Sequence, residues 1–372
     1  MVVFKREILS NSIIKHGKGG IGGKGDGLRD VDAIFAKECR PKCLAELPTH
    51  ILADEMYIRY RNNGDELDCE SREELRHIHA SLGDKPISVR PSEEGENNPN
   101  LPTSGGNTSH MLPNCHPDQE VRFSQVVQAV TLSFNQFAAR QDAGLTQNGG
   151  VAIVTSPIPG ILSNTQAGKF YYPMSAGVAD SVCAKIAHFK PGEGFGRVVF
   201  GHGYGAVQEI KAVRAIPILS ISNPTDTSGL VTVQRHFYAI NMDDRITELN
   251  FNEKGTLSLL TTRFAGPELQ YFTGDSGRLN FGQLIGHDSF GYSTGLQQIF
   301  EALKSGGPQC FEIEFTFNIF DGQGVFHLVQ YKLLRDVLSE KIDVPELQGL
   351  VEDPETWISR LNGRRVYLAT DN

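Results

Sequence analysis

A glycine-rich stretch near the N-terminus carries residue types that could hold a phosphate group. Residues 17–27 read GKGGIGGKGDG. Glycines let backbone N–H groups approach a phosphate, a following helix adds the positive end of its dipole, and Lys24 adds a charge. The stretch is neither a Walker loop, in which Ser or Thr follows the Gly-Lys pair, nor a dinucleotide fingerprint, in which GxGxxG follows a strand. The same glycines could instead form a structural turn that binds nothing.

Arg90 is a second candidate for phosphate binding. It ends the apolar run 86–90, PISVR, which is typical of a short buried strand. Residues 91–117 are rich in Pro, Asn, Ser and Gly and predict a loop after that strand. A guanidinium in this position could bind a phosphate through two parallel hydrogen bonds. The alternative is a surface ion pair with a glutamate of the acidic segment 93–96.

The most informative pattern is a β-hairpin late in the chain. Odd-numbered positions from 311 to 319 are all apolar, whereas even-numbered positions from 310 to 318 are polar or small. This alternation predicts a strand with one buried face and one face that carries Glu312 and Glu314. A turn at 321–324 and a second strand at 325–333 follow.

The length of the hairpin loop decides which residues face each other. A loop at 321–323 would place Glu314 opposite Gln330, and Glu312 opposite Lys332. Any odd loop length keeps these four side chains on one face, and an even length separates them. A carboxylate and an amide oxygen side by side suit Mg²⁺, which prefers a few oxygen ligands together with water and phosphate. The alternative is a solvated sheet face with a Glu–Lys cross-strand pair.

The elements that must position these residues change in character along the chain. Helix-like segments occur at 28–37, 71–82, 118–140 and 290–304, with a last helix starting at Asp353-Pro354. Ser71 and Glu74 form a capping box that would open the second of these helices. Strand-like segments occur at 151–158, 196–201, 229–240 and 256–265. A helix-rich first half and a strand-rich second half predict an α+β fold with its main boundary around 142–150.

Composition limits the class of protein. The 372 residues, 39% of them hydrophobic and 21% charged, suit roughly two or three compact units with buried cores. The net charge of −9 argues against a general nucleic-acid surface. No apolar run suits a signal peptide or a membrane span, and six scattered cysteines fit reduced thiols. We therefore expect a cytoplasmic protein that binds neither nucleic acid nor membrane.

Seven short motifs along the chain together resemble one family. They are IGGKGDGL (21–28), PISVRPSEEGEN (86–97), SAGVAD (175–180), GHGYGAV (201–207), HDSFGYSTGLQQIF (287–300), EIEF (312–315) and LVQYK (328–332). In this order they resemble the N-terminal nucleotide-binding domain of the pyruvate phosphate dikinase and phosphoenolpyruvate synthase family. They cover about 17–335 of the chain.

The resemblance implies an ATP-grasp-like fold with the nucleotide site between two subdomains. Residues 1–145 would form the helix-rich N-terminal subdomain with the glycine-rich loop. Residues 146–336 would form the strand-rich C-terminal subdomain with the metal-binding hairpin. Residues 337–372 would be a tail or linker.

The resemblance also implies roles for individual residues. Lys24 and Arg90 would hold the ATP phosphates, and Glu314 and Gln330 would bind Mg²⁺. Lys332 stands where the family has an arginine on the phosphates. The catalytic set implied is Lys24, Arg90 and Lys332, and the nucleotide-binding set is Gly22, Gly23, Lys24, Arg90, Glu314, Gln330 and Lys332.

The reaction implied is phosphoryl transfer from ATP to a histidine on a separate swivelling domain. That phosphohistidine domain would lie in the same longer protein or act in trans, and the final acceptor would be pyruvate or another small molecule such as rifampin. Two departures from the family pattern favour an alternative. Pro91 replaces a serine, and Lys332 replaces an arginine and loses its forked geometry. The alternative function is a catalytically weak or inactive nucleotide-binding domain with a regulatory or scaffold role.

One motif resembles the family's phosphohistidine domain instead. Residues 105–110, GGNTSH, match a GGxTSH pattern, but the small and aliphatic residues expected after the histidine are missing. We therefore expect His110 to lie in a loop of the nucleotide domain and not to accept phosphate. A metal site of His110, Cys115 and His116 is also not expected, because no fourth ligand has suitable spacing.

Overall fold

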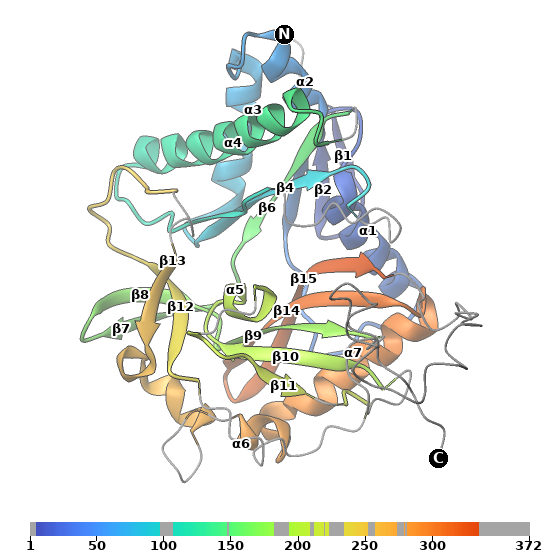
Figure 1. The fold of residues 1–372 in the computed structure, drawn as a ribbon, viewed down its shortest axis with the longest axis vertical. Helices are drawn as coiled ribbons and strands as arrows, with labels where there is room; N and C mark the ends of the chain where they lie inside the picture. The colour runs from blue at the N-terminus through green and yellow to red at the C-terminus, as the bar shows by residue number, and fades with distance from the viewer. Residues whose placement is uncertain are drawn as a thin grey trace, which may run out of the picture.

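In the part of the chain that it describes, the computed structural model combines helices with three β-sheets, as expected for an α+β protein (Figure 1). It describes residues 5–96, 107–146, 149–181, 193–208, 212–218, 220–222, 234–251, 257–273, 279 and 281–334. The predicted tail at 337–372, the predicted last helix and the first part of the predicted strand at 229–240 lie outside these ranges.

The first sheet forms the upper part of the molecule in Figure 1 and has the strand order β1-β2-β3-β6-β4-β5. Its strands are β1 (Arg6–Ile8), β2 (Ile13–His16), β3 (Thr49–Leu52), β4 (Ile87–Glu93), β5 (His110–Leu112) and β6 (Val151–Pro157). Because β6 lies between β3 and β4, this sheet extends beyond position 145. The predicted division at 145/146 therefore does not coincide with the boundary between the sheets.

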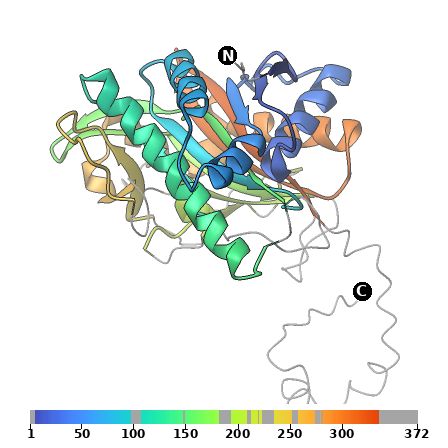
Figure 2. The same ribbon diagram turned by 90° about the horizontal axis from the view of Figure 1, so that it is seen from above.

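The side chains of β4 alternate between the two faces of the first sheet, and different helices cover these faces. Ile87 and Val89 point into a core formed with helices α2 (Glu55–Asn62), α3 (Cys69–Leu82) and α4 (Gln119–Asp142). Figure 2 shows α4 along the outside of the molecule, with strands of the sheet behind it. The opposite face is covered by the start of α1 (Gly22–Lys37). Since side chains alternate along a strand, Arg90 and Ser92 belong to the α1 face.

β4 is longer than the sequence predicts. The strand continues through Pro91 to Glu93, and β5 occupies 110–112, so the predicted loop at 91–117 is wrong in both places. Proline normally interrupts a central strand because it has no N–H to donate. It is accommodated here because β5 pairs only with Ile87 to Val89, and no other strand among the described residues pairs with β4 on that side from Arg90 onward.

One of two predicted helix starts is confirmed, and the other is wrong. The long helix predicted at 118–140 is confirmed as α4, and Asp118 caps it by accepting a hydrogen bond from the Glu120 N–H at 2.8 Å. The predicted capping box of α3 is wrong. Asp68 is the residue that caps this helix, through the Ser71 N–H at 2.7 Å, and the Glu74 side chain instead bonds to Arg6 and His16.

The second sheet is antiparallel throughout and has the strand order β11-β10-β9-β14-β15. Its strands are β9 (Ser175–Asp180), β10 (Phe195–Phe200), β11 (Ile216–Ile218), β14 (Phe311–Phe320) and β15 (Gln323–Leu333). Helix α7 (Tyr292–Gly306) packs on it, and the short helices α5 (Tyr204–Val207) and α6 (Gly282–Ile285) lie nearby.

A smaller sheet flanks the second one at the lower left of Figure 1, with the order β13-β12-β8-β7. Its strands are β7 (Ile161–Thr165), β8 (Gly168–Tyr172), β12 (His236–Asn241) and β13 (Leu257–Thr261). Three 3₁₀ turns, η1 (Thr262–Phe264), η2 (Pro267–Phe272) and η3 (Ser289–Gly291), complete the described elements.

Helix α1 belongs to two cores at once. Near its start, Ile21 and Leu28 pack against the first sheet. Further along, Val31, Ile34 and Phe35 join the core of the second sheet and α7. The helix therefore connects the two main sheets.

In the part of the chain that the structure describes, no helix combines the length and apolar character needed to cross a membrane. No disulfide joins two cysteines there either, in keeping with the expected thiols.

Candidate functional site

Three segments far apart in the sequence meet beside the edge of the second sheet. They are the start of α1, the C-terminal half of β4 and the β14–β15 hairpin, drawn in orange in Figure 1. Hydrogen bonds connect α1 to β4 and β4 to the hairpin. The predicted residues Lys24, Arg90, Glu314 and Gln330 are therefore gathered in one region.

The hairpin has the predicted pairs but not the predicted loop. Glu314 lies opposite Gln330, and Glu312 lies opposite Lys332. The loop, however, contains two residues, Asp321 and Gly322, because Phe320 already pairs with Gln323. Both loop residues have positive φ, 51° and 76°, as a type I′ turn requires. By the argument from loop length alone, this even number would have separated the four side chains.

A β-bulge at Val329 restores the register. Phe315 pairs with Leu328, whereas the preceding Glu314 pairs with Gln330, so Val329 is left over on β15. One extra residue shifts the alternation by one position, which returns Gln330 to the face of Glu314. The Val329 carbonyl accepts a hydrogen bond from Arg90 Nη1.

Arg90 binds the hairpin through three oxygens. Nη2 donates to Glu314 Oε2 at 3.1 Å and to Gln330 Oε1 at 2.5 Å, in addition to the bond from Nη1 to the backbone. Only 9% of Arg90 is exposed. A surface ion pair with the segment 93–96, the alternative from the sequence, is therefore wrong.

The oxygens of Glu314 and Gln330 suit a hard cation. Both approach the same guanidinium nitrogen, so they converge on one point that already holds positive charge. Two such oxygens match the few protein ligands that Mg²⁺ takes when water and phosphate supply the rest. Among the described residues, no group of three or more His, Cys, Asp and Glu side chains could hold a metal. Burial raises the pKa of Glu314, and Arg90 opposes that shift.

The glycine-rich stretch is mostly helix. The sequence predicts a loop through residue 27, but α1 begins at Gly22, so Gly22, Gly23 and Lys24 form its first turn. A Cβ on Gly22 would lie 2.1 Å from the Ser92 carbonyl oxygen, and its φ is 66°. The prediction of a loop is wrong because these glycines allow the helix to pack directly on β4.

Ser92 caps α1 from another element. The helix has no side-chain cap of its own at Ile21. The fully buried Ser92 Oγ accepts hydrogen bonds from the Lys24 N–H at 3.0 Å and the Gly25 N–H at 3.3 Å, and donates to the Ile21 carbonyl at 3.0 Å. This hydroxyl is thus occupied in fixing the start of α1 against β4.

Lys24 is paired with a carboxylate. Its Nζ donates to the Pro91 carbonyl at 2.9 Å and to Glu96 Oε1. Both charged side chains are 12% exposed. Burial lowers the pKa of Lys24, whereas the carboxylate of Glu96 acts to raise it.

Lys332 lies further along the same face of the hairpin. It is opposite Glu312, which in turn is opposite Asp180 on β9. Burial raises the pKa of Glu312 to about 7, with Asp180 adding to the shift and Lys332 and Arg197 opposing it. Glu312 and Asp180 thus form an acid pair beside the site.

Sequence reasoning did not find two further features. Glu93, only 7% exposed, binds Arg140 of α4, and Arg140 Nη1 also donates to Asn107 Oδ1 at 3.0 Å. This contact fixes the end of β4.

His202 lies near Arg90, and burial with a contribution from Arg90 lowers its pKa to about 4. Its Nδ1 accepts from the Tyr204 N–H at 3.2 Å. The only sequence signal for His202 is its place in the motif GHGYGAV.

His110 is a core residue. It lies on β5 with no exposed surface, its ring meets that of Phe251 edge to face at 5.1 Å between centroids, and burial lowers its pKa to about 4. Its expected location in a loop is wrong.

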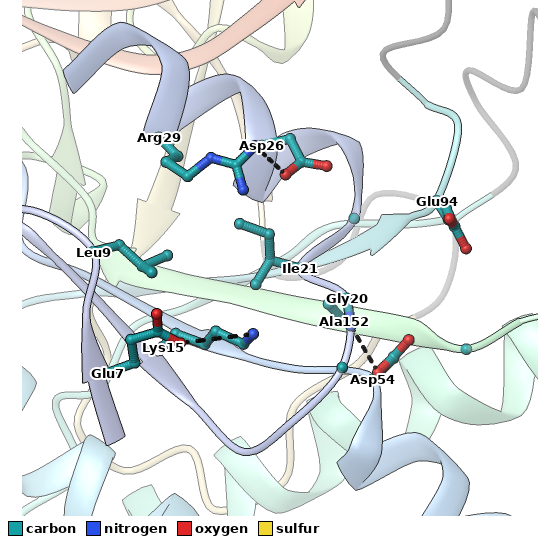
Figure 3. A pocket seen from close by; sticks show the side chains of 13 residues that line it. Glu7, Leu9, Lys15, Gly20, Ile21, Asp26, Arg29, Asp54, Glu94 and Ala152 are labelled. Carbon is teal, nitrogen blue, oxygen red and sulfur yellow. Dashed lines mark hydrogen bonds and ion pairs between the residues drawn. The ribbon is translucent and has the colours of Figure 1, made fainter. Parts of the chain in front are cut away.

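A cavity of about 230 Å³ lies beside the start of α1 (Figure 3). Its lining carries the carboxylates of Glu7, Asp26, Asp54 and Glu94 and the cations Lys15 and Arg29. Gly22, Asp26 and Arg29 share one face of α1, since residues four and three apart lie on the same side, whereas Lys24 projects from the other side. Of the predicted site residues, only Gly22 lines this cavity.

No protein-family model matches this sequence, and no curated protein matches it.

Proposed function

We propose that this chain is an ATP- and Mg²⁺-dependent phosphotransferase domain of the dikinase type, with an ATP-grasp-like arrangement of its two main sheets. One observation carries the proposal. Three separate segments bring together Lys24, Arg90, Glu314 and Gln330. Arg90 donates hydrogen bonds to Glu314 and Gln330, and Lys24 donates one to the carbonyl of Pro91, the residue next to Arg90. Two cations beside two oxygen ligands are the components that phosphoryl transfer requires.

Each residue has a role that its chemistry suits. Lys24 and Arg90 bind phosphate oxygens, Lys24 as a point charge and Arg90 as a forked donor. Glu314 and Gln330 hold Mg²⁺, which when bound neutralises phosphate charge and orients the transferring group. Ser92 keeps Lys24 in place by capping α1. Lys332, on the same face as Gln330, adds a further positive charge.

The acceptor is a histidine on a separate phosphohistidine domain, in the same longer protein or in trans. That histidine would pass the phosphoryl group to pyruvate or another small acceptor. The side chains named above bind and neutralise the nucleotide, so the chemistry of the acceptor depends on the other domain.

A second candidate is a regulatory domain that binds the nucleotide without transferring phosphate. It is favoured by the pairing of both cations, Lys24 with Glu96 and Arg90 with Glu314. Pro91 contributes no hydroxyl, and the Ser92 hydroxyl is occupied by α1.

Calorimetry with ATP, in the presence and absence of Mg²⁺, tests the proposal. Lys24→Ala and Glu314→Ala are each expected to weaken MgATP binding at least tenfold. Lys18→Ala, which removes an exposed lysine from the same glycine-rich stretch, is the matched control and should bind as the wild type does. Absence of ATP binding by the wild type, or unchanged binding by both site variants, would contradict the proposal.

Turnover separates the two candidates. The wild type and the double variant Pro91→Ser with Lys332→Arg are each mixed with ATP and an isolated phosphohistidine domain of a pyruvate phosphate dikinase. A phosphotransferase labels the histidine already as the wild type. Labelling by the double variant alone supports the regulatory function.

A further inference from the structure

Arg90 connects the two main sheets of the molecule. It belongs to β4 of the first sheet, and its guanidinium donates to Glu314, Gln330 and the Val329 carbonyl of the second. We refer to these three hydrogen bonds as the Arg90 clasp. Because the bulge at Val329 turns a backbone carbonyl toward Arg90, side chains and backbone of the hairpin all contribute to the clasp.

Two of the three acceptors are the oxygens that the proposed function assigns to Mg²⁺. Glu314 Oε2 and Gln330 Oε1 both lie within hydrogen-bonding distance of Arg90 Nη2, at 3.1 and 2.5 Å. A divalent cation bound to this pair of oxygens would occupy nearly the same place as that nitrogen. Two cations cannot share so small a volume, because their repulsion in a nearly buried site is large.

We propose that Arg90 is a placeholder cation that a divalent metal ion displaces from Glu314 and Gln330. This inference rests on the proposed function, which supplies the reason for a metal to bind there. The guanidinium keeps the half-buried carboxylate of Glu314 neutralised until the metal ion arrives. Displacement ends the clasp and leaves the guanidinium free to bind the phosphates of a nucleotide.

The exchange couples the metal ion to the nucleotide. A metal ion that binds alone leaves Arg90 without an anionic partner in a nearly buried place, which is unfavourable. A nucleotide provides the new partner, so each ligand is expected to increase the affinity for the other by the same factor. Without nucleotide, the metal ion should therefore bind weakly to the wild type.

Binding of Mn²⁺ to the full chain without nucleotide, followed by electron paramagnetic resonance, tests the exchange. Arg90→Gln removes the competing charge, so this variant is expected to bind Mn²⁺ at least tenfold more tightly than the wild type. The double variant Arg90→Gln with Glu314→Gln should lose that gain. Arg76→Gln is the matched control, because Arg76 forms its ion pair with Glu120 at the surface, and its Mn²⁺ affinity should equal that of the wild type.

Mn²⁺ affinity that does not rise in Arg90→Gln, or that persists after Glu314 is also replaced, overturns the proposal. If Arg90→Gln does not fold, Arg90→Lys retains a positive charge but not the forked geometry, and it should still bind Mn²⁺ more tightly than the wild type. Hydrogen exchange of wild-type β15 provides a second measurement, and Mn²⁺ with ATP should change it. No change on binding would contradict the release of the clasp.

The two proposals fail separately. If ATP does not bind to the wild type under any condition, the proposed function is wrong, whereas the Mn²⁺ affinity of Arg90→Gln still decides the exchange. If MgATP binds but Arg90→Gln gains no Mn²⁺ affinity, only the exchange is wrong.

Discussion

Lys24 and Glu96 form an ion pair that any phosphate bound to Lys24 must replace. Lys24 Nζ has one carboxylate and one carbonyl as partners, and Glu96 Oε2 is buried without a hydrogen-bond partner among the described residues. A carboxylate with an unsatisfied buried oxygen competes weakly with the highly charged triphosphate of ATP, because that oxygen regains hydrogen bonds to water when the carboxylate is displaced.

Glu96→Gln is expected to increase the affinity for ATP. It removes both the competing anion and its repulsion of the phosphates, and about 1.4 kcal/mol corresponds to a tenfold change. We expect roughly a five- to tenfold gain in calorimetry. Glu94→Gln, a change at the exposed glutamate two residues away, is the control. Weaker binding by Glu96→Gln would mean that the carboxylate is needed to keep the buried Lys24 protonated.

Glu312 carries a proton near neutral pH because it is buried beside Asp180. Its pKa is about 7, against 4.5 for an exposed glutamate. Between these two values the folded state holds a proton that the unfolded state has lost. The free energy of unfolding therefore falls as pH rises through this window, and it levels off above pH 7.

Glu312→Gln removes this pH dependence, because glutamine imitates the protonated acid and can still donate to Asp180. Relative to the wild type, the variant should gain roughly 3 kcal/mol in stability between pH 4.5 and pH 8, since the shift from 4.5 to about 7 corresponds to about 1.4 kcal/mol per pKa unit. Urea unfolding at several pH values measures the difference. Glu66→Gln at an exposed position is the control, and its free energy of unfolding should depend on pH as that of the wild type does. If the free energy of unfolding of Glu312→Gln changes with pH as that of the wild type does, Glu312 ionises normally.

At the scale of elements, α1 depends on β4 for its start. A single hydroxyl, that of Ser92, serves two N–H groups of the first turn and one carbonyl. Since the first N–H groups of a helix have no partners within it, this contact replaces the cap that Ile21 cannot provide.

Ser92→Ala is expected to destabilise the protein by about 2 kcal/mol, from loss of a helix cap and of partners for buried N–H groups. Urea unfolding at pH 7 is the measurement. Ser124→Ala, at an exposed position of α4, removes a hydroxyl that donates to the Val121 carbonyl at 2.8 Å but caps no helix, and it should cost less than about 0.5 kcal/mol. Equal effects of the two changes would argue against a cap supplied by β4.

The hairpin shows where sequence reasoning about elements succeeds and where it stops. The alternation of β14 was sufficient to predict the strand and the face of Glu312 and Glu314. The apolar pattern of β15 also contains a sign of the bulge, because Phe326 and Leu328 are buried at even positions and Tyr331 at an odd position. A change of phase of this kind indicates an extra residue. The loop length alone does not reveal this bulge.

At the scale of the whole molecule, α1 makes the two main cores dependent on each other. Ile34 packs against Gly306 and Gly307, where an added Cβ would lie 2.6 and 2.5 Å from Ile34 atoms. Such close packing means that the helix cannot move away from the second core without leaving a cavity. The Arg90 clasp provides a second connection between the sheets.

Ile34→Ala is expected to cost about 2–4 kcal/mol, from lost burial and a cavity. Because α1 contacts both cores, hydrogen exchange measured by mass spectrometry should accelerate in β4 as well as in β14. Ile78→Ala in α3 is the comparison, since Ile78 belongs only to the core of the first sheet. Its effect should be larger in β4 than in β14. Acceleration restricted to one sheet in Ile34→Ala would contradict the coupling.

The sequence by itself determined the features that depend on local periodicity. The long helix α4, the strand containing Arg90 and the two faces of β14 all follow from the spacing of apolar side chains. It also named the four residues that meet at the candidate site.

Only the tertiary structure decided how these residues are held. Gly22 can begin α1 there because the Ser92 carbonyl oxygen lies too close to it for any side chain. Arg90 donates a hydrogen bond to Glu314, which lies 224 positions further along the chain. Such contacts between distant segments leave no periodic trace in the sequence, since they depend on how separate elements pack.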